Sequence, residues 1–209
     1  MGPRLSRALG IGLEIIGRLG ALAGLGLFAV IALNHARQQR DIYSLLLFLD
    51  QAVNVLFVLT ARWPTAIDRR PHVMIVAVGA TFSNLFLSLH GGLDIAPRAL
   101  VYALQLTGVA IQLVAKLSLG RSFGIVPANR GVKTGGAYRL VRHPTYAGYV
   151  VAQAGALLGS LSWRNAAVVA TVCALLVLRI WLEERVLMKD EKYRAYAARV
   201  RWRVVPGLL

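Results

Sequence analysis

The sequence has little charge, few acidic residues and a single cysteine. Only 16% of its 209 residues are charged, 57% are hydrophobic, and the mean hydropathy is +0.60. Soluble domains usually contain about 25% charged and about 45–50% apolar residues. This composition argues against an ordinary soluble domain and indicates a membrane protein. The lone Cys173 excludes a disulfide framework and a cysteine-based zinc site.

Acidic residues are scarce relative to basic ones. The chain has 24 Lys and Arg against nine Asp and Glu, which gives a net charge of +15. In a soluble protein this excess would suggest nucleic-acid binding. Here the basic residues lie between apolar segments and in the C-terminal tail, as the positive-inside rule and anionic headgroups would require. We therefore expect membrane lipid as a partner, and no nucleic acid.

Signals for a metal or for a dinucleotide-binding domain are also weak. The four histidines are too scattered to suggest a metal, and we expect none; they are His35, His72, His90 and His143. Gly24-Leu25-Gly26 lies inside an apolar segment rather than after a strand. A Rossmann domain is therefore not expected.

Apolar segments of about 20 residues recur along the chain and are long enough to span a bilayer as helices. Six are expected, at residues 8–33, 42–61, 72–89, 98–119, 144–161 and 165–182. The fold class is therefore an all-α integral membrane protein with about six transmembrane helices, or five if the first segment lies in the interface.

The last two segments should form a helical hairpin that turns at Ser162-Trp163-Arg164. The tail from Glu183 is polar. Apolar side chains recur along it at helical spacing, which predicts an amphipathic helix against the membrane or the site. These side chains are Val186, Tyr193, Tyr196, Ala197 and Val200.

The distribution of Lys and Arg predicts the topology. With six spans and the N-terminus inside, the outer connections carry only Arg37, Arg40, Arg98 and Arg164. Most other basic residues then lie inside. A multi-pass protein with both termini and the polar C-terminal stretches in the cytoplasm is expected.

The charged residues inside the expected spans include Asp50 and Lys116. Asp50, with Gln51 and Asn54, is a functional candidate because a buried acid is costly. The alternative is a hydrogen bond to another helix, for example to Asn84. Lys116 lies near the end of its segment and is expected to extend toward the headgroups.

The most informative stretch is residues 135–148, GGAYRLVRHPTYAG, which is polar although it lies between two apolar regions. The glycines allow tight turning. His143 precedes Pro144, so it should adopt extended backbone just before a helix begins. The free N–H groups of Thr145 and Tyr146 should then favour an anionic group.

The hairpin also predicts that His143 and the pair Glu183-Glu184 lie close in depth. Carboxylates at that position could accept hydrogen bonds from ribose hydroxyls or face a cation. The alternative is a solvated interface in which they pair with Arg185 or Lys189.

Four stretches together resemble the membrane methyltransferase family that includes isoprenylcysteine carboxyl methyltransferases and phospholipid N-methyltransferases. They are SLGRSFGIVP, GAYRLVRHPTYAGYV, the Glu183-Glu184 pair and KYRAYAARVRWRVVPGLL. The resemblance covers residues 116–207. It implies that residues 116–209 form the catalytic region and residues 1–115 a scaffold for substrate access.

The resemblance implies S-adenosylmethionine as cofactor and a lipophilic or membrane-embedded small substrate. The implied cofactor-binding residues are Arg130, Gly131, Val132, Lys133, Tyr138, Arg142, His143, Pro144, Thr145, Tyr146, Glu183 and Glu184. Arg199 matches the arginine that follows a Tyr-x-x-Tyr pair near the reacting group of the substrate, and Arg203 is the second catalytic candidate. Arg201 stands where the eukaryotic enzymes have proline, which leaves the substrate open.

Two other functions fit parts of the sequence. A membrane NAD(P)H-dependent reductase of similar architecture would use Arg130 and Arg142 to meet phosphates. A non-enzymatic transporter or assembly protein would use the polar residues of the second and third segments. Neither explains why polar residues gather in 135–148 and the tail. The acceptor atom (O, N or S) and the oligomeric state stay open.

Overall fold

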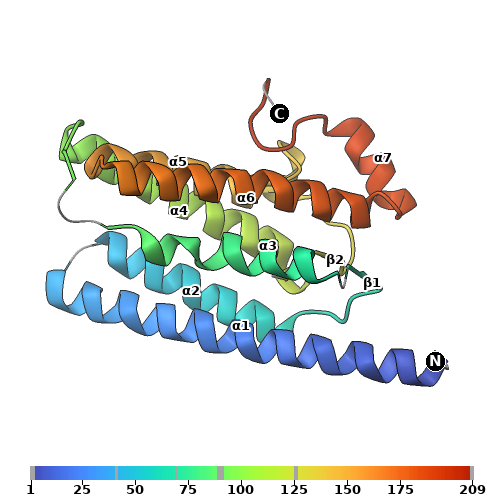
Figure 1. The fold of residues 1–209 in the computed structure, drawn as a ribbon. Helices are drawn as coiled ribbons and strands as arrows, with labels where there is room; N and C mark the ends of the chain where they lie inside the picture. The colour runs from blue at the N-terminus through green and yellow to red at the C-terminus, as the bar shows by residue number, and fades with distance from the viewer. Residues whose placement is uncertain (1–2, 41, 69, 89–91, 125–126, 208–209) are drawn as a thin grey trace. The chain divides into compact units, whose positions relative to one another are not determined.

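The computed structural model describes the whole chain except residues 1–2, 41, 69, 89–91, 125–126 and 208–209, and it is mostly helical (Figure 1). The helices are α1 (Pro3–Gln39), α2 (Ile42–Thr60), α3 (Pro71–Phe82), α4 (Arg98–Leu119), α5 (Pro144–Gly159), α6 (Trp163–Leu187) and α7 (Glu191–Arg199). Two short strands, β1 (Ala66–Ile67) and β2 (Ala128–Asn129), pair antiparallel. Short 3-10 turns lie at Ser83–Phe86, Gly120–Ser122 and Gly136–Arg139. The predicted helical membrane fold class is confirmed.

The chain forms two compact units, residues 1–60 and residues 61–209. In the first unit α1 packs along α2. The three polar residues of α2 are buried and bond one another: Gln51 and Asn54 donate to Asp50 Oδ2 at 3.2 and 3.4 Å. Asp50 therefore has hydrogen bonds within its own helix. The side chain of Asn84 lies outside the described residues, so the alternative partner named from the sequence is not tested.

Three helices are long and apolar enough to cross a membrane, at Ile15–Gln38, Arg98–Ser122 and Trp163–Leu187, among the residues that the structure describes. The helix α3 is shorter than expected, because it ends at Phe82 instead of continuing to residue 89. Its 12 residues rise about 18 Å. At its end the Ser83 hydroxyl donates to the Gly79 carbonyl, a local bond that often bends or ends helices.

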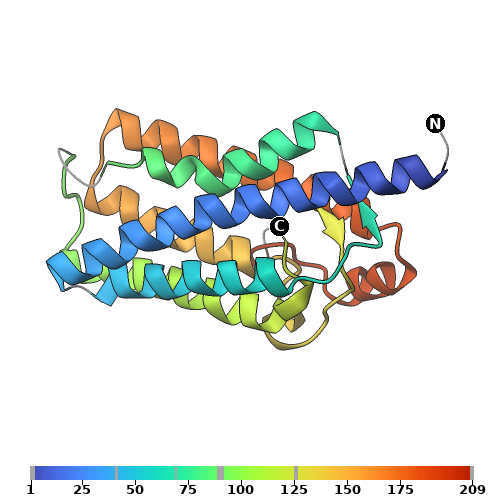
Figure 2. The same cartoon turned by 90° about the horizontal axis from the view of Figure 1, so that it is seen from below.

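The second unit contains two closely packed helix pairs, α4 with α5 and α3 with α6. Figure 2 shows α3 (green) running beside α6 (orange-red). Glycines allow α4 and α5 to approach. A Cβ on Gly108 would lie 2.5 Å from the Ala152 nitrogen, and one on Gly148 would lie 2.6 Å from the Gly108 carbonyl oxygen. Small residues at helix crossings are typical of helices that pack in lipid.

Close packing also decides the position of Lys116. Its side chain is fully buried, and its Nζ lies 5.6 Å from the centroid of the Tyr149 ring on α5. The expectation that Lys116 extends toward the headgroups was wrong, because α5 covers that face of α4.

The C-terminal helices begin and end slightly away from their predicted positions. The turn after α5 covers residues 160–162, and the Ser162 hydroxyl caps α6 by accepting from the Asn165 N–H at 3.2 Å. Helix α6 continues to Leu187, so Glu183 and Glu184 lie in its last turns rather than after it. The tail helix α7 begins only at Glu191, after the Asp190 cap.

The close crossing of α4 and α5 predicts that Gly148→Ala destabilises the protein by about 1–3 kcal/mol, because the new methyl group overlaps backbone. The matched control is Gly26→Ala in α1, where a Cβ meets nothing within 4 Å. That substitution should be neutral or stabilise by up to about 1 kcal/mol. Thermal unfolding of the purified protein in detergent measures both, and equal unfolding temperatures would contradict the packing argument.

Candidate functional site

Two segments that are far apart in sequence pair through their backbones at the start of α5. The Arg142 N–H donates to the Trp202 carbonyl at 2.9 Å, and the His143 N–H donates to the Arg203 carbonyl at 2.7 Å. His143 has φ −131° and ψ 60°, and Pro144 begins the helix. The pairing therefore fixes the C-terminal segment beside the motif that the sequence singled out.

The Glu184 carboxylate is the centre of the polar cluster. Its Oε1 lies 3.2 Å from Arg142 Nη1 and 3.3 Å from His143 Nε2, and it accepts from the Tyr193 hydroxyl at 3.5 Å. Its Oε2 accepts from Arg203 Nε at 2.9 Å. The Glu184 side chain is only 9% exposed. The predicted proximity of His143 to Glu184 is confirmed, and both carboxylate oxygens are already engaged.

The Glu183 carboxylate differs, because its hydrogen bonds fall on one oxygen. Its Oε1 accepts from the Tyr146 hydroxyl at 2.5 Å and from Arg179 Nε at 3.1 Å. His143 Nδ1 lies 3.8 Å from Oε2, beyond hydrogen-bond distance. Within the part of the chain that the structure describes, Oε2 accepts no hydrogen bond. This oxygen keeps its capacity to bind a donor.

Arg179 is the site residue that the sequence analysis missed. It lies in α6 one turn before Glu183, and its guanidinium is buried 5.7 Å from the centroid of the Tyr146 ring. It also donates to the Thr81 hydroxyl at 3.1 Å and to the Gly124 carbonyl at 3.5 Å. Two signals could have found it: a charge inside an apolar span, and its i,i+4 spacing from Glu183.

Three buried tyrosines, Tyr138, Tyr193 and Tyr196, pack together next to the cluster on the side of α7. The Tyr196 hydroxyl donates to the Tyr138 carbonyl at 2.7 Å, and the rings of Tyr193 and Tyr196 meet edge to face. Burial raises the pKa of Tyr196 to about 12 and raises the pKa values of Tyr138 and Tyr193 above the ordinary tyrosine value. All three hydroxyls therefore stay protonated and can donate hydrogen bonds at neutral pH.

The loop that follows β2 is held by Asn129. Its side chain accepts from the Gly131 N–H at 2.9 Å and donates to Asp190 Oδ2 at 2.8 Å. That hydrogen bond is the main reason why the pKa of Asp190 is lowered. Gly131 has a φ of +100°, and Val132 packs against the tyrosine cluster. The loop is thereby tied to the turn between α6 and α7.

The structure brings together most of the residues singled out from the sequence. Those joined by direct contacts are Tyr138, Arg142, His143, Thr145, Tyr146, Glu183, Glu184 and Arg203. Arg199 is not among them, because its side chain is exposed at the end of α7. One expectation was wrong: the Tyr146 N–H is not free, since it donates to the His143 carbonyl at 3.0 Å. Arg130 and Lys133 belong to the loop after β2.

The cluster is rich in arginine. Arg142, Arg179 and Arg203 face two carboxylates, before any charge on His143 is counted. Arg142 Nε is buried and has no hydrogen-bond partner among the described residues. A buried donor without a partner is unusual in native structures, and here it fits an acceptor or anionic group supplied by a ligand.

Comparison with known proteins finds a family match over the segment that holds most of this cluster. Residues 99–195 match the family model described as phospholipid methyltransferase. The chain resembles the membrane methyltransferases. The resemblance predicted from the sequence is thus confirmed, and the matched segment contains the residues of the cluster from Tyr138 to Tyr193.

One similar solved structure is a eukaryotic intramembrane Ras methyltransferase, isoprenylcysteine carboxyl methyltransferase. It shares 17% sequence identity, covers 100% of this chain and 88% of its own, and has a TM-score of 0.49. A comparison with curated proteins found no match. The family match supports a membrane methyltransferase.

The bonding of Glu184 predicts that Glu184→Gln destabilises the protein by about 3 kcal/mol, because Arg142 is left as an uncompensated buried charge. Adding Arg142→Met should recover part of the loss, since the unpaired charge is then gone. Unfolding in detergent measures both variants.

The control for this pair is Glu191→Gln, which changes an exposed carboxylate of α7 and should alter stability by less than about 0.5 kcal/mol. A Glu184→Gln protein as stable as the native one, or a double variant less stable than the sum of its single changes, would show that Glu184 does not organise the cluster.

Proposed function

We propose that the protein is an S-adenosylmethionine-dependent methyltransferase that acts on a lipophilic or membrane-embedded small substrate, as isoprenylcysteine carboxyl methyltransferases do. One observation carries the proposal. The Arg142-His143 pair, Tyr146 and the Glu183-Glu184 pair form one polar cluster at the ends of two apolar helices, inside the segment that matches the methyltransferase family.

The side chains of the cluster fit the chemical groups of S-adenosylmethionine. The unpartnered Arg142 Nε, together with Arg203, suits the carboxylate of its amino-acid part. Glu183 Oε2 suits the ammonium group or a ribose hydroxyl. The flat ring of Tyr138 beside Val132 suits the adenine. The remaining contacts would come from the backbone of Gly131 and its neighbours.

This fit gives Glu183 and Glu184 different roles, which the sequence alone did not distinguish. Glu184 already accepts from Arg142, His143 and Arg203, so its role is to orient these groups. Glu183 retains an open oxygen, which makes it the better candidate for direct contact with the cofactor. Tyr146 and Arg179 hold its other oxygen and so fix the direction of the carboxylate.

Methyl transfer requires the protein mainly to position the cofactor and the acceptor. S-adenosylmethionine, when bound, supplies a methyl group that its sulfonium has already activated. The protein must hold the acceptor in line with that group, which is an orientation effect. Burial of the cluster excludes water and strengthens its electrostatics. Arg203, whose side chain is 42% exposed, and the exposed Arg199 are the residues proposed to hold the polar end of the substrate.

The wider organisation follows the same proposal. Residues 116–209 carry the site, and residues 1–115 guide the lipophilic part of the substrate. The excess of Lys and Arg in the connections and tail supports a cytoplasmic site with both termini on that side.

The proposal predicts saturable binding of S-adenosylmethionine by the purified protein in detergent, measured by titration calorimetry. Glu183→Gln should weaken binding by about tenfold or more, because it removes a charged hydrogen-bond acceptor. Glu191→Gln, which changes an exposed carboxylate, should leave the affinity unchanged. Folding of each variant is checked by its unfolding temperature.

The same titration separates the proposal from its rival. No heat with S-adenosylmethionine and saturable binding of reduced nicotinamide nucleotide would replace the methyltransferase with a reductase. Equal affinity of native protein and Glu183→Gln would keep the cofactor and remove Glu183 from its site.

A further inference from the structure

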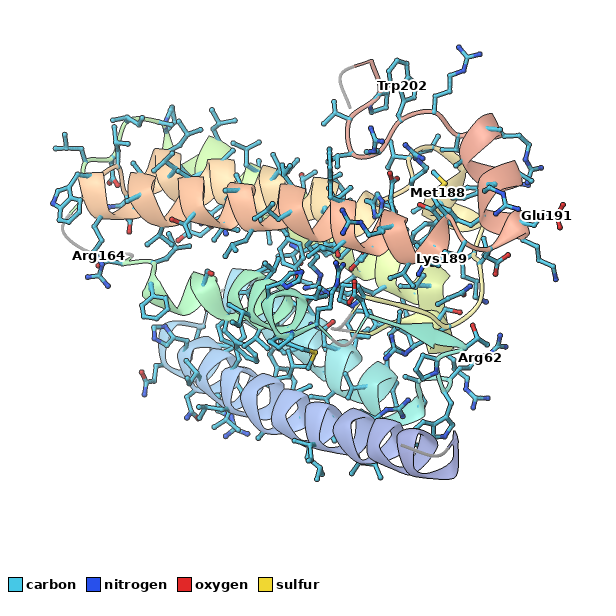
Figure 3. The ribbon with its side chains drawn as sticks, turned by 45° about the vertical axis from the view of Figure 1, so that its right-hand side comes forward. Arg62, Arg164, Met188, Lys189, Glu191 and Trp202 are labelled. Atoms are coloured by element: carbon cyan, nitrogen blue, oxygen red, sulfur yellow. The ribbon has the colours of Figure 1, made fainter. Side chains whose placement is uncertain are left out.

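Two large apolar side chains are exposed beside the polar cluster. Leu140 is 72% exposed and Trp202 is 40% exposed. They come from the two segments whose backbones pair, since Arg142 donates its N–H to the Trp202 carbonyl. Figure 3 shows Trp202 on the outer side of the C-terminal segment, beyond α6. Two large apolar side chains thus lie exposed on segments that backbone hydrogen bonds join.

The depth of this pair follows from α6. This helix is long and apolar enough to cross a membrane and ends at Leu187. Arg203 contacts Glu184, about 5 Å along the axis from that end. The paired segments therefore lie near the C-terminal end of α6, next to the first residue of α5.

The flanking side chains give this surface a charge. Arg139 and Arg201 are exposed, and each is the immediate neighbour of one of the two apolar residues. The Glu184 carboxylate, which Arg203 contacts, is buried and already paired with Arg142 and Arg203. The surface is thus basic around an apolar centre. Tryptophan with arginine is the combination found where proteins meet the headgroup region.

We propose that Leu140 and Trp202, with Arg139 and Arg201 beside them, dock on anionic lipid headgroups. The apolar pair enters the boundary between headgroups and acyl chains, and the two guanidinium groups bind phosphates. Docking holds the same paired backbone that carries Arg142, His143 and Arg203. The inference goes beyond the proposed function, because lipid docking needs neither the cofactor nor a substrate.

The test places an environment-sensitive fluorophore at position 140, through Leu140→Cys in a Cys173→Ser background. The labelled protein is put into nanodiscs of phosphatidylcholine alone or of phosphatidylcholine mixed with phosphatidylglycerol. The anionic discs should give a blue-shifted, brighter label. The double variant Arg139→Glu/Arg201→Glu should bind anionic lipid more weakly. The ratio of docked to undocked label should fall by at least about fivefold for each arginine that is replaced.

Two further variants keep the result interpretable. Arg139→Gln with Arg201→Gln removes the charges without reversing them and should give a smaller loss in the same direction. Arg98→Glu changes an exposed arginine at the start of α4 and should leave the label response unchanged. Equal label spectra in the two kinds of disc, or a response that survives both double variants, would overturn the proposal and point to a protein partner on this surface.

Discussion

One buried carboxylate, that of Glu184, holds together the polar part of this membrane protein. Its two oxygens bind Arg142, His143 and Arg203, and the Tyr193 hydroxyl adds a weaker contact. These groups come from the start of α5, from α7 and from the C-terminal segment. A buried charge is tolerated only when paired and hydrogen-bonded. The arrangement of the whole site therefore depends on keeping this one carboxylate satisfied.

The neighbouring carboxylate of Glu183 is also held by buried hydrogen bonds, and this leaves part of it available to a ligand. Arg179 and Tyr146 occupy one of its oxygens and leave the other without a donor among the described residues. Arg142 in turn retains a buried Nε–H that has no acceptor within the described part of the chain. An open acceptor and an open donor, each held by fixed neighbours, are suited to a ligand that carries both an ammonium and a carboxylate.

The sequence predicted the elements better than it predicted the partners of single side chains. Apolar segment lengths predicted where each long helix lies, although α3 ends at Phe82 instead of residue 89. The hairpin argument placed His143 close to Glu184. Both predictions follow from local patterns. The burial of Lys116 and the cross-helix bonds of Arg179 depend on which helix covers which face, and no local pattern encodes that. The prediction that the Tyr146 N–H is free was wrong, because it donates to the His143 carbonyl in the first turn of α5.

The most direct test of the account is to locate bound S-adenosylmethionine on the chain. Ultraviolet cross-linking of methyl-labelled S-adenosylmethionine to the purified protein, followed by mass spectrometry of peptides, gives that location. The account predicts label in the peptides that contain residues 130–146 or Glu183, and its loss when excess unlabelled cofactor is present. Two results would contradict the account. One is label that excess unlabelled cofactor removes but that lies only in α1 and α2. The other is folded protein that carries no label removable by unlabelled cofactor.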